Sequence, residues 1–208
     1  MTQDVLLVGA SGLAREVLAA GITGVVGILD DSEALQGRVV GGAEVVGDIA
    51  HAAQRDELLL LCVGPGAGRR SIVARLDALG VPPERYTTFV AASARVGASS
   101  SIGAGSILLD GVVVTADASV GSHVVVMPSS TITHDCVIGD FATLAAGVTL
   151  GGSVRVGVAA YLGMNASVRQ GLRIGDTATV GMGAVVLADV PAAQTWAGVP
   201  ARPLGEHA

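Results

Sequence analysis

Aliphatic side chains recur at every sixth position over the second half of the chain. Counted in steps of six from Val90 to Val186, all 17 positions hold Val, Ile or Leu. Neither the helical period of about 3.6 residues nor the two-residue period of an ordinary strand gives this spacing. The pattern predicts a solenoid with three flat sides in each coil, in which short strands stack and the aliphatic side chains fill the interior.

Small residues accompany the aliphatic ones and favour a chain that turns sharply between sides. Glycine directly follows the aliphatic residue in nine of the 17 hexads. Because three sides make one coil, the hexads amount to about 5.7 coils. No insertion interrupts the hexads, so a site on this part of the chain must use coil surfaces, a neighbouring subunit or the other half of the sequence.

The first half of the chain has short apolar runs separated by glycine-rich turns. The runs predict, in order, a strand, a helix, two strands and a helix, at residues 5–8, 13–20, 25–29, 57–63 and 69–79. The apolar residues of the second helix are expected to share one face: Ile72, Val73, Leu76 and Leu79. We therefore expect a small Rossmann-like α/β domain at residues 1–85, a parallel β-helix at 86–190 and a C-terminal cap at 191–208.

Glycine-rich turns follow two of these strands, and a pair of carboxylates follows the third. In a parallel α/β sheet, ligands bind at the carboxyl ends of the strands, where these segments would meet. A glycine turn at a helix N-terminus suits a phosphate, and an acidic pair suits hydroxyl groups or a base edge. The predicted substrate-binding residues are Gly9, Ser11, Gly12, Leu13, Asp30, Asp31 and Gly64. The full G-x-G-x-x-G pattern is missing, which favours a nucleotide over a dinucleotide; purely structural turns are the other interpretation.

Charge and composition narrow the possible partners. The chain has 18 acidic and 12 basic residues among 208, a net charge of −6, so nucleic acid is not expected as a main partner. The mean hydropathy of +0.63 is high, and the stacked interior accounts for it. The longest apolar stretch near the N-terminus, residues 17–29, is shorter than the roughly 20 residues of a membrane span. With no legible secretory or transit sequence, we expect a cytoplasmic protein without a membrane span.

Cysteines and two of the histidines give little sign of a site. Cys62 and Cys136 show no metal-binding or redox spacing and are interpreted as small buried apolar residues. His51, in a predicted helical segment, and His207, near the C-terminus, are expected on the solvated surface.

His134 is the strongest candidate for chemistry. It lies two positions after the inward-facing Ile132, where a side chain should leave the coil, and Asp135 follows it. An outward imidazole beside a carboxylate is what a general base for an amine or hydroxyl nucleophile requires. His123 is 11 residues away on a different coil side, and no third ligand is present, so we predict no metal. An ordinary exposed histidine is the alternative interpretation.

Several segments together resemble one bacterial enzyme family. They are the turn Gly9-Ala10-Ser11-Gly12, the sequence Leu29-Asp30-Asp31, the hexads, the segment Ile132-Thr133-His134-Asp135-Cys136-Val137-Ile138-Gly139 and the closing Gly198-Val199-Pro200-Ala201. This combination, over nearly the whole chain, is similar to the bacterial sugar acetyltransferases. That family includes the UDP-4-amino-sugar N-acetyltransferases of the bacillosamine and perosamine pathways and the sialic acid O-acetyltransferases.

The resemblance implies a left-handed β-helix and a homotrimer with active sites between subunits. The N-terminal domain would hold a nucleotide-linked sugar and the β-helix would hold acetyl-CoA. By the same resemblance, His134 would take a proton from the acceptor, and Asp135 would orient and polarise it. The backbone N–H of Gly152, one coil above His134, would contact the thioester oxygen. The other residues implied in coenzyme binding are Thr143, Met164 and Met182.

The expected activity is N-acetylation of the 4-amino group of a UDP- or other NDP-linked 4-amino-4,6-dideoxy sugar. O-acetylation of a sialic acid and a non-catalytic nucleotide-sugar-binding trimer are the alternatives. Thr143 and Met127 stand where family members commonly have histidine and asparagine, and Leu13 stands where some have histidine. Because of these departures, the resemblance does not determine which acceptor the protein uses. The single tryptophan, Trp196, is interpreted as part of a cap, as a contact for the coenzyme's adenine, or as both.

Overall fold

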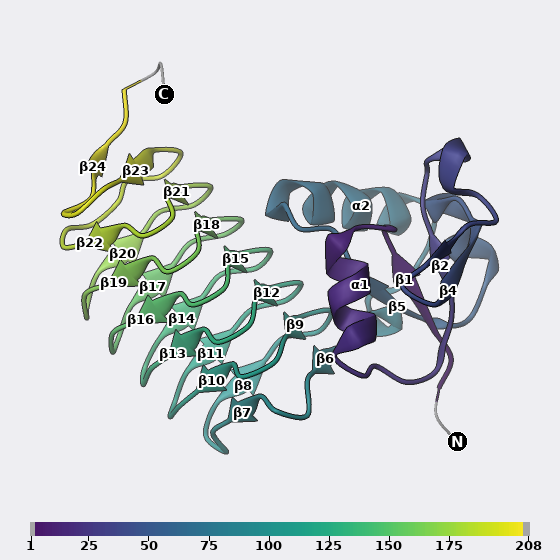
Figure 1. The fold of residues 1–208 in the computed structure, drawn as a ribbon, viewed down its shortest axis with the longest axis horizontal. Coiled ribbons are helices and arrows are strands. Elements are labelled where there is room, and N and C mark those ends of the chain that lie inside the picture. Colours follow the sequence, from purple (N-terminus) through teal and green to yellow (C-terminus); the bar gives the residue numbers. More distant parts are fainter. Residues whose placement is uncertain (1–2, 206–208) are drawn as a thin grey trace.

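The first part of the chain forms a five-stranded sheet with two helices, and the second part forms a stack of three-sided coils (Figure 1). The structure is a computed structural model that describes residues 3–205. Helix α1 lies between the sheet and the first coils, because Leu13 and Val17 belong to the same buried cluster as Ile107 and Val125 of the coils. The two parts of the chain therefore share a packed interface.

The N-terminal sheet has the strand order β3-β4-β2-β1-β5. Its parallel strands are β1 (Val5–Val8), β2 (Val25–Leu29), β4 (Ala43–Gly47) and β5 (Leu58–Leu61), and β3 (Val39–Val40) is antiparallel to β4. The helices are α1 (Gly12–Ala19), after β1, and α2 (Gly66–Ala78), after β5, and 3-10 turns occupy Glu33–Leu35, Ile49–Gln54 and Pro83–Arg85. The carboxyl ends of β1, β2 and β5 consequently lie along one edge of the sheet.

The predicted strands and helices of the first half occur, with two differences. The pattern misses the hairpin of β3 and β4, whose signal is the two-residue turn Gly41-Gly42. Helix α2 begins at Gly66 and ends at Ala78, so Leu79 is its C-cap. The prediction that Leu79 shares a helical face with Leu76 is wrong, because Leu79 lies beyond the last helical turn and is 47% exposed.

Seventeen two-residue strands follow, one for each hexad. They are β6 (Phe89–Val90), β7 (Arg95–Val96), β8 (Ser101–Ile102), β9 (Ile107–Leu108), β10 (Val113–Val114), β11 (Ser119–Val120), β12 (Val125–Val126), β13 (Thr131–Ile132), β14 (Val137–Ile138), β15 (Thr143–Leu144), β16 (Thr149–Leu150), β17 (Arg155–Val156), β18 (Tyr161–Leu162), β19 (Ser167–Val168), β20 (Arg173–Ile174), β21 (Thr179–Val180) and β22 (Val185–Val186). In each strand, the second residue is the aliphatic one of the repeat.

These strands form three parallel sheets, which we name after their first members. The β6 sheet holds β6, β9, β12, β15, β18 and β21; the β7 sheet holds β7, β10, β13, β16, β19 and β22; and the β8 sheet holds β8, β11, β14, β17 and β20. Ile132 pairs with Val114 below and with Leu150 above, an offset of 18 residues in each direction. The predicted 18-residue coil is therefore confirmed, and the coils meet at three corners: β6–β7, β7–β8 and β8–β6.

The aliphatic residues of the hexads fill the interior of the coils. Ile132, Leu144 and Leu150 are each at most 1% exposed and belong to one continuous buried cluster. Burying a side chain of this size stabilises the folded chain by about 1.5–3 kcal/mol. The stacked interior is thus the main source of stability for the second half of the chain.

The glycines that follow the aliphatic residues have a different role from the predicted one. The turns are made two residues later, where φ is positive, for example 73° at Gly105 and 60° at Asp135. Gly103 instead lies against the next coil, and a Cβ placed on it would come 2.4 Å from the carbonyl carbon of Gly121. These glycines therefore allow the coils to stack closely, and the left-handed turn residues lie elsewhere.

The last coil is covered by β23 (Thr195–Ala197), which pairs with β21, and by β24 (Arg202–Pro203), which is antiparallel to β23. Trp196 packs against the buried cluster at this end of the coils. Cys62 and Cys136 are buried, as expected from the sequence. Within residues 3–205, no helix combines the length and the apolar character needed to cross a bilayer.

Candidate active site

A cavity of about 820 Å³ lies between the N-terminal unit and the outer face of the β6 sheet. Its walls come from the start of α1, the loop after β5 and the outward residues of three coils. The lining residues are Ser11, Gly12, Leu13, Glu16, Gly64, Pro65, Gly66, Ala67, Val125, Met127, Pro128, Thr143, Ala145, Ala146, Ala159, Tyr161 and Met164. The cavity thus brings four of the predicted substrate-binding residues together with two of the predicted coenzyme-binding residues.

Two helices begin at this cavity. Ser11 caps α1, because its hydroxyl accepts the backbone N–H of Leu13 at 3.0 Å while it donates to the carbonyl of Cys62 at 2.6 Å. Pro65 precedes α2 and provides no side-chain cap for the first turn of that helix. Backbone N–H groups at a helix start attract anions. A phosphate group in this cavity would therefore meet favourable partial charges from two helices.

Three of the predicted substrate-binding residues do not line the cavity. Gly9 has a φ of 102° and approaches Val63 closely, so it shapes the turn after β1. Both carboxylate oxygens of Asp30 accept backbone N–H groups, from Ala10 at 2.7 Å and from Ser32 at 2.9 Å. These contacts hold the loop after β1 against the end of β2.

Asp31 is likewise engaged within the chain. Its carboxylate forms an ion pair with Arg75 of α2 at 2.7 Å and accepts the backbone N–H of Ile49 at 3.1 Å. The hydrogen bond from Arg75 lowers the pKa of Asp31 below its ordinary value. The acidic pair therefore orders the carboxyl edge of the sheet.

Thr143 links the coils to the N-terminal unit. It is only 5% exposed, and its hydroxyl donates to the Gly64 carbonyl at 3.0 Å and accepts from Arg69 at 3.1 Å. A histidine in this place would need two separate ring nitrogens for the two contacts that the single Thr143 hydroxyl makes. Thr143 lines the cavity, but its hydroxyl group is already used in hydrogen bonds to Gly64 and Arg69 of the N-terminal unit.

Arg69 is the centre of that interface and is completely buried. Its guanidinium donates to carbonyl oxygens of both units: Val63, Gly64, His123, Phe141 and Ala142. Burial lowers the pKa of Arg69 to about 10, so the side chain stays charged at neutral pH. Its sequence position in α2 gives no sign of this role, because charged residues on a helix usually face solvent.

His123 lies beside this arginine in an aromatic setting. Its ring stacks on Phe141 at a centroid distance of 5.1 Å and meets Tyr86 edge-on at 4.7 Å. Burial, with a smaller contribution from the charge of Arg69, lowers the pKa of His123 to about 4, although the carboxylate of Asp140 acts in the opposite direction. The imidazole is therefore neutral in the folded protein.

Stability should fall on mild acidification because of His123. An unfolded histidine titrates near pH 6.5, whereas the folded one titrates at about 4. The stabilisation is complete above pH 6.5 and is lost as the pH falls toward 4, which amounts to about 2 kcal/mol between pH 6.5 and 5. Urea unfolding at several pH values measures this slope. His123→Phe keeps the ring stacking and should flatten it, and an equally steep slope in that variant would contradict the assignment.

The imidazole of His134 lies on the β7–β8 corner, next to a carboxylate. Its Nδ1 is 2.7 Å from Oδ2 of Asp135, and both side chains are more than half exposed. Because the carboxylate can only accept, Nδ1 carries the proton in the neutral ring and Nε2 presents its lone pair. The pair is thus arranged so that Nε2 can act as a base.

Gly152 lies directly above this ring. A Cβ on Gly152 would come 2.4 Å from Cε1 and 2.5 Å from Nε2 of His134. The backbone here is not in the left-handed region, so the glycine is required by the close approach of the imidazole. The predicted neighbourhood of Gly152 and His134, one coil apart, is therefore present.

Replacing Gly152 with alanine should disturb the base while leaving the coil intact. The added methyl group must push the imidazole away, and a displacement of about 1 Å lowers a catalytic rate by about 100-fold. Steady-state kinetics together with thermal unfolding would measure this effect. The matched control is Ser99→Ala, an exposed residue on the same corner two coils below Asp135, which should keep its activity. Wild-type kcat in Gly152→Ala would show that the ring position does not matter.

The cavity and His134 lie on different corners of the coils. Met164 and Met182 are exposed on the β6–β7 corner, on the same side as the cavity, whereas His134 and Gly152 are on the β7–β8 corner. One side of the coil, the β7 sheet, separates the two groups. Within one chain, the predicted residues therefore form two separate half-sites.

Glu16 and Tyr161 are among the cavity residues that the sequence did not single out. Glu16 contributes a carboxylate from α1, and Tyr161 pairs with Thr143 one coil below it. The 18-residue offset from Thr143 is the signal that could have revealed Tyr161. Glu16 has no comparable signal, because a glutamate at this point of a short helix is ordinary.

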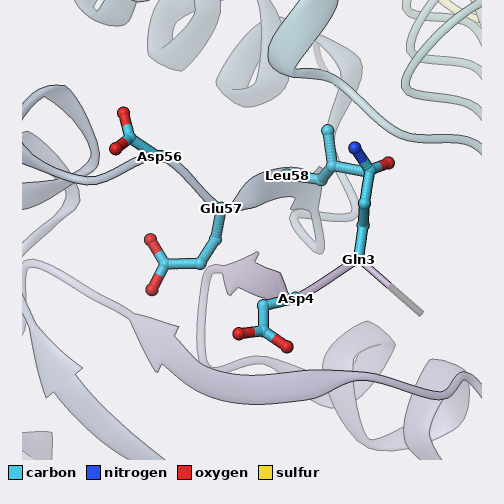
Figure 2. A pocket seen from close by; sticks show the side chains of 5 residues that line it. All are labelled: Gln3, Asp4, Asp56, Glu57 and Leu58. Atoms are coloured by element: carbon cyan, nitrogen blue, oxygen red, sulfur yellow. The ribbon is translucent and has the colours of Figure 1, made fainter. Parts of the chain in front are cut away.

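A second hollow, shown in Figure 2, is unsuited to a phosphate ligand. It is lined by Gln3, Asp4, Asp56, Glu57 and Leu58, at the amino ends of β1 and β5. Arg55 binds Glu57 and lowers the pKa of that carboxyl group to about 2. The carboxylates of Asp4 and Asp56, together with Glu57, make the hollow acidic. In the part of the chain that the structure describes, no group of three His, Cys, Asp or Glu residues is placed to hold a metal ion.

Comparison with solved structures gives matches over almost the whole chain. The acetyltransferase domain of PglB from Neisseria gonorrhoeae FA1090, in complex with acetyl coenzyme A, is 31% identical, covers 98% of this chain and 100% of its own, and has a TM-score of 0.88. PerB from Caulobacter crescentus, in complex with CoA and GDP-perosamine, is 30% identical with 99% of each chain covered and a TM-score of 0.88. WeeI from Acinetobacter baumannii AYE, 24% identical with a TM-score of 0.70, covers 98% of this chain and 100% of its own and has the same fold.

A family model gives a shorter match. The model described as bacterial transferase hexapeptide (six repeats) matches residues 117–152, a segment that contains His134, Asp135 and Gly152. No curated protein matches the chain significantly. The half-site on the β7–β8 corner thus lies within the matched repeats.

Proposed function

This chain belongs to the hexapeptide-repeat sugar acetyltransferases, and we propose that it transfers the acetyl group of acetyl-CoA to the 4-amino group of a nucleotide-linked 4-amino-4,6-dideoxy sugar. The observation that carries this proposal is the His134–Asp135 pair, with Nε2 free and Gly152 directly above the ring. The PerB complex, which holds GDP-perosamine, supports a nucleotide-linked amino sugar as the acceptor. The sequence-based expectation of a cytoplasmic protein belongs to the same proposal.

The proposed reaction is a direct acyl transfer. The neutral amine attacks the thioester carbon, and its nitrogen loses a proton to Nε2 of His134. Asp135 accepts the Nδ1–H and stabilises the imidazolium that forms. The N–H of Gly152 stabilises the negative charge on the thioester oxygen. Collapse of the intermediate breaks the carbon–sulfur bond, and the thiolate of CoA leaves and takes up the proton.

The two half-sites support a site built from two copies of the chain. We infer that the β7–β8 corner of one copy faces the cavity and the exposed Met164 and Met182 of another, within a trimer of left-handed β-helices. The cavity would hold the nucleotide, where the starts of α1 and α2 suit its phosphates. His134 of the neighbouring copy would then reach the sugar at the cavity mouth.

The test is an activity screen with matched controls. The protein is incubated with acetyl-CoA and with UDP-, GDP- or dTDP-linked 4-amino sugars, and thiol release is followed; sialic acid is included in the panel. Thiol release with one amino sugar supports the proposal and identifies the substrate. Release with sialic acid alone would replace it with O-acetylation. Nucleotide-sugar binding without thiol release across the panel would favour the non-catalytic trimer.

A further inference from the structure

Three arginines gather on one corner of the coils, above His134. The sequence contains no lysine, so its 12 basic residues are all arginines. Arg155 begins β17, Arg173 begins β20, and Arg169 follows β19 where the chain enters the same corner. All three flank the β7–β8 corner and are exposed. The chain as a whole carries a net charge of −6, so this cluster is a basic patch on an otherwise acidic protein.

The cluster is in line with the catalytic half-site. Gly152 is one coil above His134, and Gln170 is one coil above Gly152 at the same corner. Arg155 therefore lies in the coil of Gly152, and the other two arginines lie in the coil of Gln170. Strands in adjacent coils are about 4.8 Å apart, so the cluster extends to about 10 Å above the imidazole along the stack. In Figure 1, β14, β17 and β20 follow one another along this side.

Ion pairs do not neutralise the charges of the cluster within residues 3–205. Arg155 and Arg173 occupy directly paired positions on neighbouring coils, and like charges so placed repel each other. In the described part of the chain, none of the three arginines forms a side-chain ion pair. The neighbouring carboxylate, Asp189, accepts the backbone N–H of Arg173 at 2.8 Å. An anion that bridged the guanidinium groups would relieve this repulsion.

We propose that Arg155, Arg169 and Arg173 bind the phosphate groups of the acyl donor. The inference rests on the proposed role of His134, which places the thioester beside Gly152. Coenzyme A carries its diphosphate and its 3′-phosphate at the far end of the pantetheine arm from the thioester. A pantetheine arm that follows the β7–β8 corner upward brings those phosphates to the arginines. The planar guanidinium group of an arginine can donate two parallel hydrogen bonds to phosphate oxygens.

Calorimetric titration with CoA tests the proposal without any sugar acceptor. Each substitution by glutamine should weaken CoA binding by about tenfold, the effect of losing one charge-assisted hydrogen bond, and the triple variant should weaken it by at least about 100-fold. Pantetheine, which lacks the phosphates, should bind the triple variant and the wild-type protein equally. Arg95→Gln, an exposed arginine two coils below His134, is the matched control and should bind CoA normally.

Three results would overturn the proposal. The first is unchanged CoA affinity in the triple variant. The second is an equal loss of pantetheine binding, which would indicate a structural effect. The third is a loss confined to GDP or UDP binding, which would assign the arginines to the acceptor. Since CoA binding is measured without turnover, failure of the sugar screen does not affect the conclusion about the three arginines. The proposed acceptor and the arginine cluster are therefore tested separately.

Discussion

Replacement of His134 with alanine should lower kcat for acetyl transfer by about 10²- to 10⁴-fold, the usual contribution of a positioned general base. The expected loss follows from the geometry of the ring: Nδ1 is bound to Asp135, and Nε2 is the free basic nitrogen. Within residues 3–205, no other imidazole lies on this corner: His51 is in the N-terminal unit, and His123 is buried on the β8–β6 corner, stacked on Phe141. The measurement is thiol release at saturating acetyl-CoA and amino sugar.

Folding and binding should be unaffected in the same variant. The side chain of His134 is 64% exposed and bonds only to Asp135, so its removal leaves the stacked interior intact. Unfolding temperature and CoA affinity are the controls. Asp135→Asn keeps the size of the side chain but removes its charge, and it should reduce kcat less than His134→Ala. Full activity in His134→Ala would disprove its role as the base, whereas a lower unfolding temperature would assign it a structural role.

The coils and the half-site on their β7–β8 corner could be predicted because both depend on a fixed period. One aliphatic residue per side determines each strand, and the 18-residue offset between coils places Gly152 next to His134. The pair of His134 and Asp135 is adjacent in sequence, so no knowledge of long-range packing was needed. A strictly periodic chain converts sequence distance directly into spatial distance.

The cavity and its surroundings could not be predicted in this way. They arise where a sheet-and-helix unit without internal repeats packs on the coils, and no period relates the two. Arg69 illustrates the difficulty, because it stands in the sequence Gly68-Arg69-Arg70-Ser71, which is typical of a solvent-exposed helix turn. The sequence also gives no sign that Asp30 and Asp31 are held by backbone groups and by Arg75.

Replacing Arg69 with methionine should destabilise the protein by an amount on the order of 4 kcal/mol. The guanidinium is wholly buried, and among residues 3–205 it is the only side chain that donates to the carbonyls of His123, Phe141 and Ala142. Methionine fills a similar volume but donates nothing, so the carbonyls of His123 and Phe141 lose this donor in a dry interface, whereas the Ala142 carbonyl keeps the backbone N–H of Val125. Lysine would restore the charge but could reach fewer of the carbonyls, so Arg69→Lys should lie between methionine and the wild type.

The neighbouring Arg70 provides a control for charge and helix propensity. Arg70→Met removes the same charge from the next position of α2, where the side chain is exposed and forms no hydrogen bond or ion pair with the described part of the chain. Urea unfolding followed by circular dichroism compares the variants, and the nucleotide binding that we propose for the cavity is measured in parallel. Arg69 positions the Gly64 loop at the cavity wall, so Arg69→Met should also lose nucleotide affinity while the coils keep their β-structure. If Arg69→Met is as stable as Arg70→Met, the buried guanidinium is not what joins the two parts of the chain.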